Sequence, residues 1–161
     1  MRETLMWPHP CLRTGADPVA EITDDILAIW DDMIAVMEAM PGIGLAAPQI
    51  GIGERLAVVD ASDTRGQVIR MANPVVLDAS KETELRPEAS PCLPGVSAQI
   101  TRPRAITVQY LDHTGTVVGK DLDGMWARSC LHQIDHMDGK MYFDNLSKLK
   151  RTMLLKKARK S

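Results

Sequence analysis

The feature that most constrains the fold is a long middle region that predicts one strand after another, with no helical pattern between them. Glycine, proline, asparagine or aspartate stands in the breaks between the predicted strands. These strands cover residues 55–60, 67–71, 74–78, 98–101, 105–111 and 117–122. Parallel strands need long crossover connections, usually helices, so this region predicts mostly antiparallel pairing.

Helical patterns flank the strand region on both sides. After an N-cap at Thr23, apolar residues recur every three or four positions from Ile26 to Met40, and Pro41-Gly42 ends this helix. A second helix is expected over about 125–137, and a third, basic helix from about 145 to the end. The order predicts an α+β fold, with one domain over residues 1–161 and mostly antiparallel sheets around the second helix.

The second helix carries the most informative motif, Cys130-Leu131-His132-Gln133-Ile134-Asp135-His136. Two histidines four residues apart lie on one helix face, which is the geometry a divalent metal needs. The hydrolytic motif H-E-x-x-H has a glutamate as general base after the first histidine, and here that position holds Gln133. The alternative is that both histidines are simply packed in or near the core.

A third metal ligand would have to come from another segment, and Cys92 is the best thiolate candidate. Cys11 and Cys130 are alternatives by residue type. Cys130 projects about 160° away from His132 around the helix, so we expect it in the core. For Cys11 we favour a small, buried hydrophobic role.

The loop after the first helix reads Gly42-Ile43-Gly44-Leu45-Ala46-Ala47-Pro48-Gln49. Its glycines allow a sharp turn or a close approach to a ligand, and the amide of Gln49 can both donate and accept. It lacks the glycine and lysine pattern of a phosphate loop. A binding site and a simple helix-to-strand turn are equally compatible with these residues.

In combination, these motifs resemble those of the peptide deformylase family, which are G-x-G-L-A-A-x-Q, E-G-C-L-S and H-E-x-x-H in that order. The first is intact at residues 42–49, and His9-Pro10-Cys11-Leu12-Arg13 is similar to the family's H-P-x-L-R. The resemblance covers nearly the whole chain. It implies removal of the formyl group from the N-formylmethionyl end of new proteins.

The resemblance also implies roles for single residues. The family holds a divalent metal, iron or its zinc, nickel and cobalt substitutes, between the motif-two cysteine and both histidines. Its first-motif glutamine and the backbone after the cysteine form the oxyanion hole. Carried over, the metal ligands are His132, His136 and Cys92, the oxyanion donors are Gln49 and Leu93, Gln133 takes the acid–base position, and Gly42, Ile43, Gly44 and Leu45 contact substrate.

The second motif departs from the family and can be aligned in two ways. Alignment on Cys92 leaves the following Pro-Gly two residues early. We prefer the gapless alignment, which places Ser90 at the family's cysteine and lets Glu88 and Arg102 reproduce a family ion pair. Cys92 could then reach a metal only if Pro91 reshapes the segment. Leu131, where the family usually has glutamine, is a milder departure.

Gln133 cannot take a proton, so a loss of about 10²–10⁴-fold in catalysis is expected. The leading hypothesis is therefore a diverged deformylase with weak or altered activity on N-formylated or N-acylated peptides. The rival is a non-catalytic protein that binds peptide N-termini or a partner.

Bulk properties limit the possible partners. The net charge of −2 gives no reason to expect DNA or an anionic membrane, and no apolar run approaches the ~20 residues of a membrane span. Three irregularly spaced cysteines and the lack of a signal-peptide pattern favour a reducing cytoplasm. Residues 148–160 hold seven basic side chains and no acid. A solvated helix face is the common explanation, and the resemblance adds ribosome contact as a second one.

Overall fold

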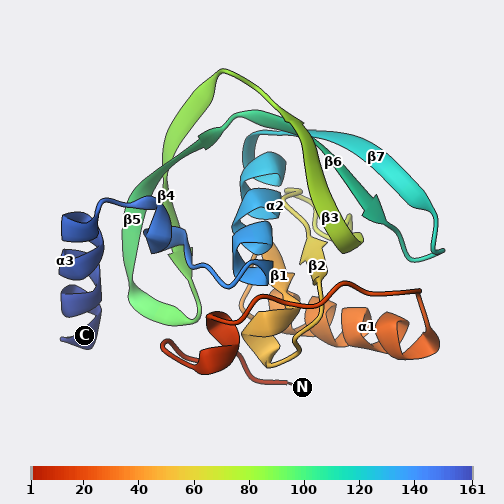
Figure 1. Cartoon of the computed structure of the whole chain (residues 1–161), viewed down its shortest axis with the longest axis horizontal. Coiled ribbons are helices and arrows are strands. Elements are labelled where there is room, and N and C mark those ends of the chain that lie inside the picture. The colour runs from red at the N-terminus through yellow and green to blue at the C-terminus, as the bar shows by residue number, and fades with distance from the viewer. Residues whose placement is uncertain (1, 161) are drawn as a thin grey trace.

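The computed structural model describes residues 2–160, in which α-helices, strands and short 3-10 helices alternate as the α+β prediction requires. Figure 1 shows α2 near the centre of the molecule, with the β4–β5 pair and the larger sheet on opposite sides of it. The helices are α1 (Asp24–Ala39), α2 (Gly124–Met137) and α3 (Lys148–Arg159), with η1 (Pro10–Leu12), η2 (Ala47–Ile50) and η3 (Tyr142–Asn145). The strands are β1 (Gly44–Ala46), β2 (Leu56–Val59), β3 (Ile69–Ala79), β4 (Thr83–Ser90), β5 (Leu93–Pro103), β6 (Ala105–Leu111) and β7 (Val117–Asp123).

Every pairing between these strands is antiparallel, which confirms the pairing predicted from the sequence. The larger sheet has the order β1-β2-β3-β6-β7, and β4 pairs with β5 alone. The β4–β5 pair stands apart from the larger sheet, and α2 lies in the space between the two sheets.

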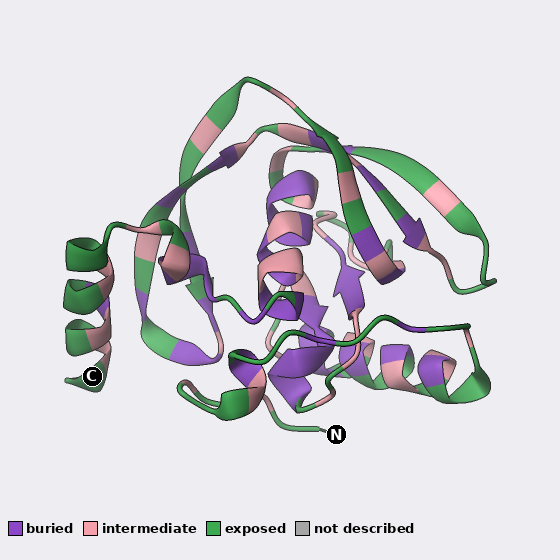
Figure 2. Ribbon diagram, viewed as in Figure 1, coloured by how far each residue is buried: buried purple, intermediate pink, exposed green. Residues whose placement is uncertain are grey.

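The core forms around this central helix, as the burial pattern in Figure 2 shows. One cluster joins α2 to the larger sheet and includes Cys130 and Met71. A second packs α1, through Trp30, against β1 and β2. A third, which includes Phe143 and Leu154, lies between β5, η3 and α3. Burial on both flanks fixes the rotation of α2 and therefore the directions of its two histidines.

The structure corrects several predicted boundaries. The strands expected at 67–71 and 74–78 form one strand, β3, whose pairing shifts register between Ala72 and Val75. Asn73 lies there at φ 52° and forms two hydrogen bonds of 2.8 Å with the backbone of Val19. Asn-Pro therefore marks a bulge within the strand, where the sequence pattern predicted a break.

Other elements were missed or misplaced. β1 and β4 were not predicted, since β1 has three residues and β4 carries charges and a proline. The segment expected at 98–101 is part of the longer β5. α1 ends one residue earlier than expected, and α3 begins at Lys148 because the hydroxyl of Ser147 caps it. Within residues 2–160, no helix is both long and apolar enough to cross a membrane.

Candidate functional site

The two histidines of α2 lie side by side on one face of the helix, as the spacing predicts. Their ring centroids are 5.0 Å apart, and the ring of Tyr142 stacks on His132 at 5.9 Å. Both histidines are buried. α2 therefore presents a pair of imidazoles between the two sheets.

A buried charge network around Glu88 orients His132. The carboxylate of Glu88 accepts from Arg102 at 2.6 and 2.9 Å and from Arg128 at 2.6 Å, and its Oε1 lies 2.8 Å from His132 Nδ1. Arg102 also pairs with Asp135 at 3.0 Å. The ion pair that the gapless alignment predicts between Glu88 and Arg102 is confirmed. The contact with the Glu88 carboxylate fixes the orientation of the His132 ring through its Nδ1.

Glu88 is too strongly stabilised as a carboxylate to act as a general base near neutral pH. Burial raises its pKa, but the hydrogen bonds from Arg102 and His132 and the positive charge of Arg102 outweigh burial and bring the pKa to about 2. A base poised for proton transfer needs a pKa near the working pH. Glu88 therefore positions its neighbours and cannot replace the missing glutamate at position 133.

Several buried polar atoms near the histidines have no hydrogen-bond partner among the described residues. They are both ring nitrogens of His136, Oε1 of Gln133 and the hydroxyl of Tyr142. Burial, followed by the effects of His132 and Arg102, holds the pKa of His136 well below its ordinary value, so its ring is neutral near pH 7. Buried polar groups without partners are uncommon, and here they mark a place where a ligand, ion or water can bind.

The glycine loop packs directly against α2. A Cβ on Gly44 would lie 2.5 Å from Gln133 Nε2 and closer still to Ser129 Oγ, so a larger residue there would force these two side chains to move. The carbonyl of Ile43 accepts from Ser129 Oγ and from the backbone of Asp60, both at 2.9 Å. The loop is therefore packed closely on α2 as well as forming a turn.

Arg65 holds the start of the same loop from outside. Its guanidinium donates to the carbonyl of Gly42 at 2.6 Å and to the carbonyl of Asp60 at 3.1 Å, and it pairs with Glu38 of α1 at 3.0 Å. These contacts fix the backbone at residues 42–44. These contacts hold the loop against α1 and the segment that follows β2.

Ser90 and Cys92 lie in different surroundings. Ser90 is buried at the end of β4 and lines the pocket, and its Oγ accepts from the backbone N–H of Cys92 at 3.2 Å. Cys92 belongs to the core cluster that includes Leu93 and Phe143, and burial raises its thiol pKa. Gln49 Nε2 lies 3.7 Å from the sulfur of Cys92, a weak contact. Ser90, and not Cys92, faces the pocket.

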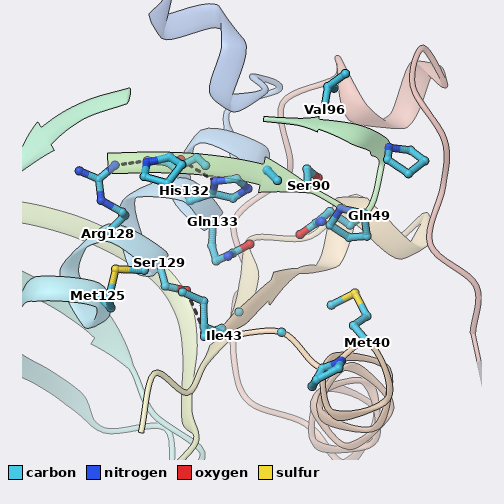
Figure 3. Close-up of a pocket in the computed structure, with 18 of the residues that line it drawn as sticks. Met40, Ile43, Gln49, Ser90, Val96, Met125, Arg128, Ser129, His132 and Gln133 are labelled. Carbon is cyan, nitrogen blue, oxygen red and sulfur yellow. Dashed lines mark hydrogen bonds and ion pairs between the residues drawn. The ribbon is translucent and has the colours of Figure 1, made fainter. Parts of the chain in front are cut away.

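These residues surround a cavity of about 520 Å³ between the glycine loop, β4, β5 and α2 (Figure 3). Seven of the residues predicted for the site line it: Gly42, Ile43, Gly44, Gln49, Ser90, His132 and Gln133. Leu45, Cys92, Leu93 and His136 do not line it and are buried in the core. The predicted roles of these residues stay predictions.

Some pocket residues had no predicted role. Arg128 and Ser129 line the cavity from α2, as does Met125 at the start of the helix. Arg128 stands four residues before His132, so helical spacing alone could have placed it on the same face. Met40 and Val96 also line the cavity, and nothing in the sequence distinguishes them from core residues.

Cysteines 11 and 130 are not part of the cavity. Cys130 is in the core, as expected, and burial raises its pKa to about 12. Cys11 is only partly buried, so the expectation of a buried residue is wrong there. It lies in the short helix η1 next to the surface.

The donors present fit a divalent metal only in part. His132 is oriented as a metal-binding histidine usually is, and the unpartnered nitrogens of His136 could take an ion. Yet among residues 2–160 no three His, Cys, Asp or Glu side chains come together to hold one. Catalytic zinc sites use three protein ligands of these types. The set therefore does not fit the three-donor centre that the resemblance implies.

Relatives in sequence and in fold are peptide deformylases. The model of the family described as Polypeptide deformylase matches residues 1–152. A peptide deformylase of Rhodopseudomonas palustris strain TIE-1 is 36% identical over 165 residues, covering 100% of this chain and 94% of the relative. Peptide deformylase 2 of Xanthomonas axonopodis pv. citri is 41% identical over 159 residues, covering 97% and 93%.

Solved structures agree with the sequence relatives. A peptide deformylase from Legionella pneumophila superposes with a TM-score of 0.93 at 34% identity, covering 99% of this chain and 94% of that one. One from Ehrlichia chaffeensis, in complex with actinonin, gives 0.92 at 31% identity, covering 99% and 96%. Peptide deformylases are metalloenzymes that use a divalent metal. The chain belongs to the polypeptide deformylase family.

Proposed function

We propose that this protein binds the N-formylmethionyl ends of peptides in the cavity beside α2 and removes the formyl group slowly or not at all. The observation that carries the proposal is Gln133. It occupies the position of the family's catalytic glutamate at a cavity that otherwise keeps its glycine wall and its buried polar end.

The cavity suits the terminus of a peptide. Its volume of about 520 Å³ lies within the usual range for small-ligand sites. Apolar side chains such as Met40, Met125 and Val96 can contact a methionine side chain, and Ser90 and Gln133 can contact the polar formamide. Oε1 of Gln133 has no hydrogen-bond partner in the part of the chain that the structure describes, and it can accept the formamide N–H.

Hydrolysis lacks two of the groups that it needs. An amide at position 133 can orient a water molecule but cannot take its proton, and Glu88 is held as a carboxylate by its buried cations. By resemblance, the oxyanion would also bind the backbone N–H after position 90. That residue is Pro91, which has no N–H. Gln49 remains as a donor.

Titration with formyl-Met-Ala-Ser, followed by calorimetry, tests the proposal. We expect saturable binding by the wild type, and about tenfold weaker binding after Gln133→Leu, since one buried hydrogen bond of about 1.4 kcal/mol is a factor of ten. Gln109→Leu, on the exposed face of β6, is the matched control and should bind as the wild type does. Lack of any saturable binding would overturn the proposal. Actinonin, which one relative binds, is a second probe.

Turnover of the same peptide distinguishes slow deformylation from binding without deformylation. A diverged enzyme should release formate at a rate reduced by at least about 10²–10⁴-fold relative to a family member with an intact glutamate. A binding protein should release none while the peptide still binds. Formate release within about tenfold of such a relative would exclude both versions.

Ribosome contact through α3 is part of the proposed function. α3 exposes most of its basic side chains and buries only Leu154. A positively charged helix at the surface suits phosphate groups of RNA, and we place the protein in the cytoplasm, where new chains emerge. Co-sedimentation with ribosomes at two salt concentrations tests this, and binding that is absent or independent of salt would contradict it.

A further inference from the structure

Position 90 and the two histidines of α2 together decide whether this protein can hold a metal ion. The supporting contacts for a metal-binding histidine are complete, because Glu88 holds His132 Nδ1 at 2.8 Å and is itself fixed by Arg102 and Arg128. His136 lies beside His132, and neither of its ring nitrogens has a hydrogen-bond partner within residues 2–160. The contacts that orient a metal-binding histidine are therefore present at His132, and His136 lacks them.

Position 90, where the gapless alignment places the family's cysteine, does not supply a usual third metal ligand. Ser90 lines the cavity with a neutral hydroxyl, which is not among the usual protein ligands of zinc. A thiolate would bring a negative charge and a strong bond there, and a serine brings neither.

Cys92 cannot easily take over this role. Its side chain is 1% exposed and packs in the cluster that contains Leu12 and Phe143. Ser90 pairs with Leu93 across the turn that carries Cys92, so bringing the sulfur into the cavity requires this turn to rearrange.

We infer that this protein does not retain a divalent metal at the His132–His136 pair, and that the missing sulfur at position 90 is the reason. The inference goes beyond peptide binding and is independent of it. Peptide can bind through the glycine loop and Gln133 whether or not an ion is present.

The test is the metal content of the purified full-length chain, measured by plasma mass spectrometry after expression with iron and zinc supplied. The wild type should hold well below one ion per chain. Ser90→Cys should hold one and bind zinc at least about 100-fold more tightly, since even a residue that only supports a ligand is worth 10–100-fold in affinity. With cobalt, Ser90→Cys should also show a thiolate-to-cobalt charge-transfer band.

The controls identify the ligands. The double variant His132→Ala/His136→Ala, built on Ser90→Cys, should lose the ion. Cys92→Ser in the wild-type background should change nothing. One ion per wild-type chain overturns the inference, and its loss in Cys92→Ser would show that Cys92 is the third ligand. No gain in Ser90→Cys, with a circular dichroism spectrum like that of the wild type, also overturns it. If Ser90→Cys does not fold, the metal content of the wild-type chain still decides whether it retains an ion.

Discussion

The hydrogen bonds of Glu88 allow its contribution to the folding free energy to be predicted. Its carboxylate accepts hydrogen bonds from two buried arginines and from His132, at distances between 2.6 and 2.9 Å. The change of its pKa from the ordinary 4.5 to about 2 corresponds to about 3 kcal/mol of folding free energy, at 1.36 kcal/mol per pKa unit. Removing one partner of a buried ion pair typically costs 3–5 kcal/mol, which agrees.

Glu88→Gln should therefore lower the free energy of unfolding at pH 7 by about 3 kcal/mol, measured by urea denaturation. The folded-state pKa lies below the unfolded one, so the contribution of Glu88 is complete above pH 4.5 and is lost as the pH falls toward 2. The wild type should become less stable over this range and approach the variant. Glu82→Gln, whose side chain is 67% exposed beside Arg104, is the matched control and should cost less than about 1 kcal/mol.

Two results would refute this reasoning. One is a loss below about 1 kcal/mol for Glu88→Gln at pH 7, which would mean that the charge is not held by its partners. The other is a difference between wild type and variant that stays the same from pH 7 to pH 2. In that case the carboxylate charge would not be the source of the effect.

Three further predictions concern the glycine loop and the missing catalytic groups. Gly44→Ala should cost about 1–3 kcal/mol and weaken peptide binding, because its Cβ would displace the side chains of Ser129 and Gln133. A Cβ at position 42 would press only on the flexible end of Met40, so Gly42→Ala should have a mild effect. Equal losses of stability and of peptide binding in the two variants would contradict the packing argument. Ser90→Cys with Gln133→Glu should gain about 10²–10⁴-fold in deformylation over Ser90→Cys alone. Adding Pro91→Leu should give about 10²–10³-fold more by restoring a backbone N–H, and equal rates with and without it would contradict that role.

The fold could be predicted from the sequence where the pattern is long and periodic. The spacing from Ile26 to Met40 gave α1 to within a residue, and the absence of helices between the strands indicated antiparallel sheets. β1 could not be predicted, because three residues carry no period. The bulge at Asn73 could not either, since its cause is a pair of hydrogen bonds to the distant Val19.

The site was predictable where helical spacing or a gapless alignment applied. His132 and His136 share a face as expected, and the ion pair of Glu88 with Arg102 is present. The second partner of Glu88, Arg128, was missed although its spacing to His132 was informative. The surroundings of Ser90 and Cys92 depend on how the β4–β5 turn packs against the third core cluster, and no local pattern encodes that.

The central claim is that the chain keeps the peptide site of its family and has lost most of the chemistry. Measuring the dissociation constant and the formate release of formyl-Met-Ala-Ser on one sample of wild-type protein tests it most directly. The account predicts saturable binding with release at least about 100-fold slower than that of a relative with an intact H-E-x-x-H motif. Release within about tenfold of that relative would contradict it, because Gln133 could not then be the limiting residue.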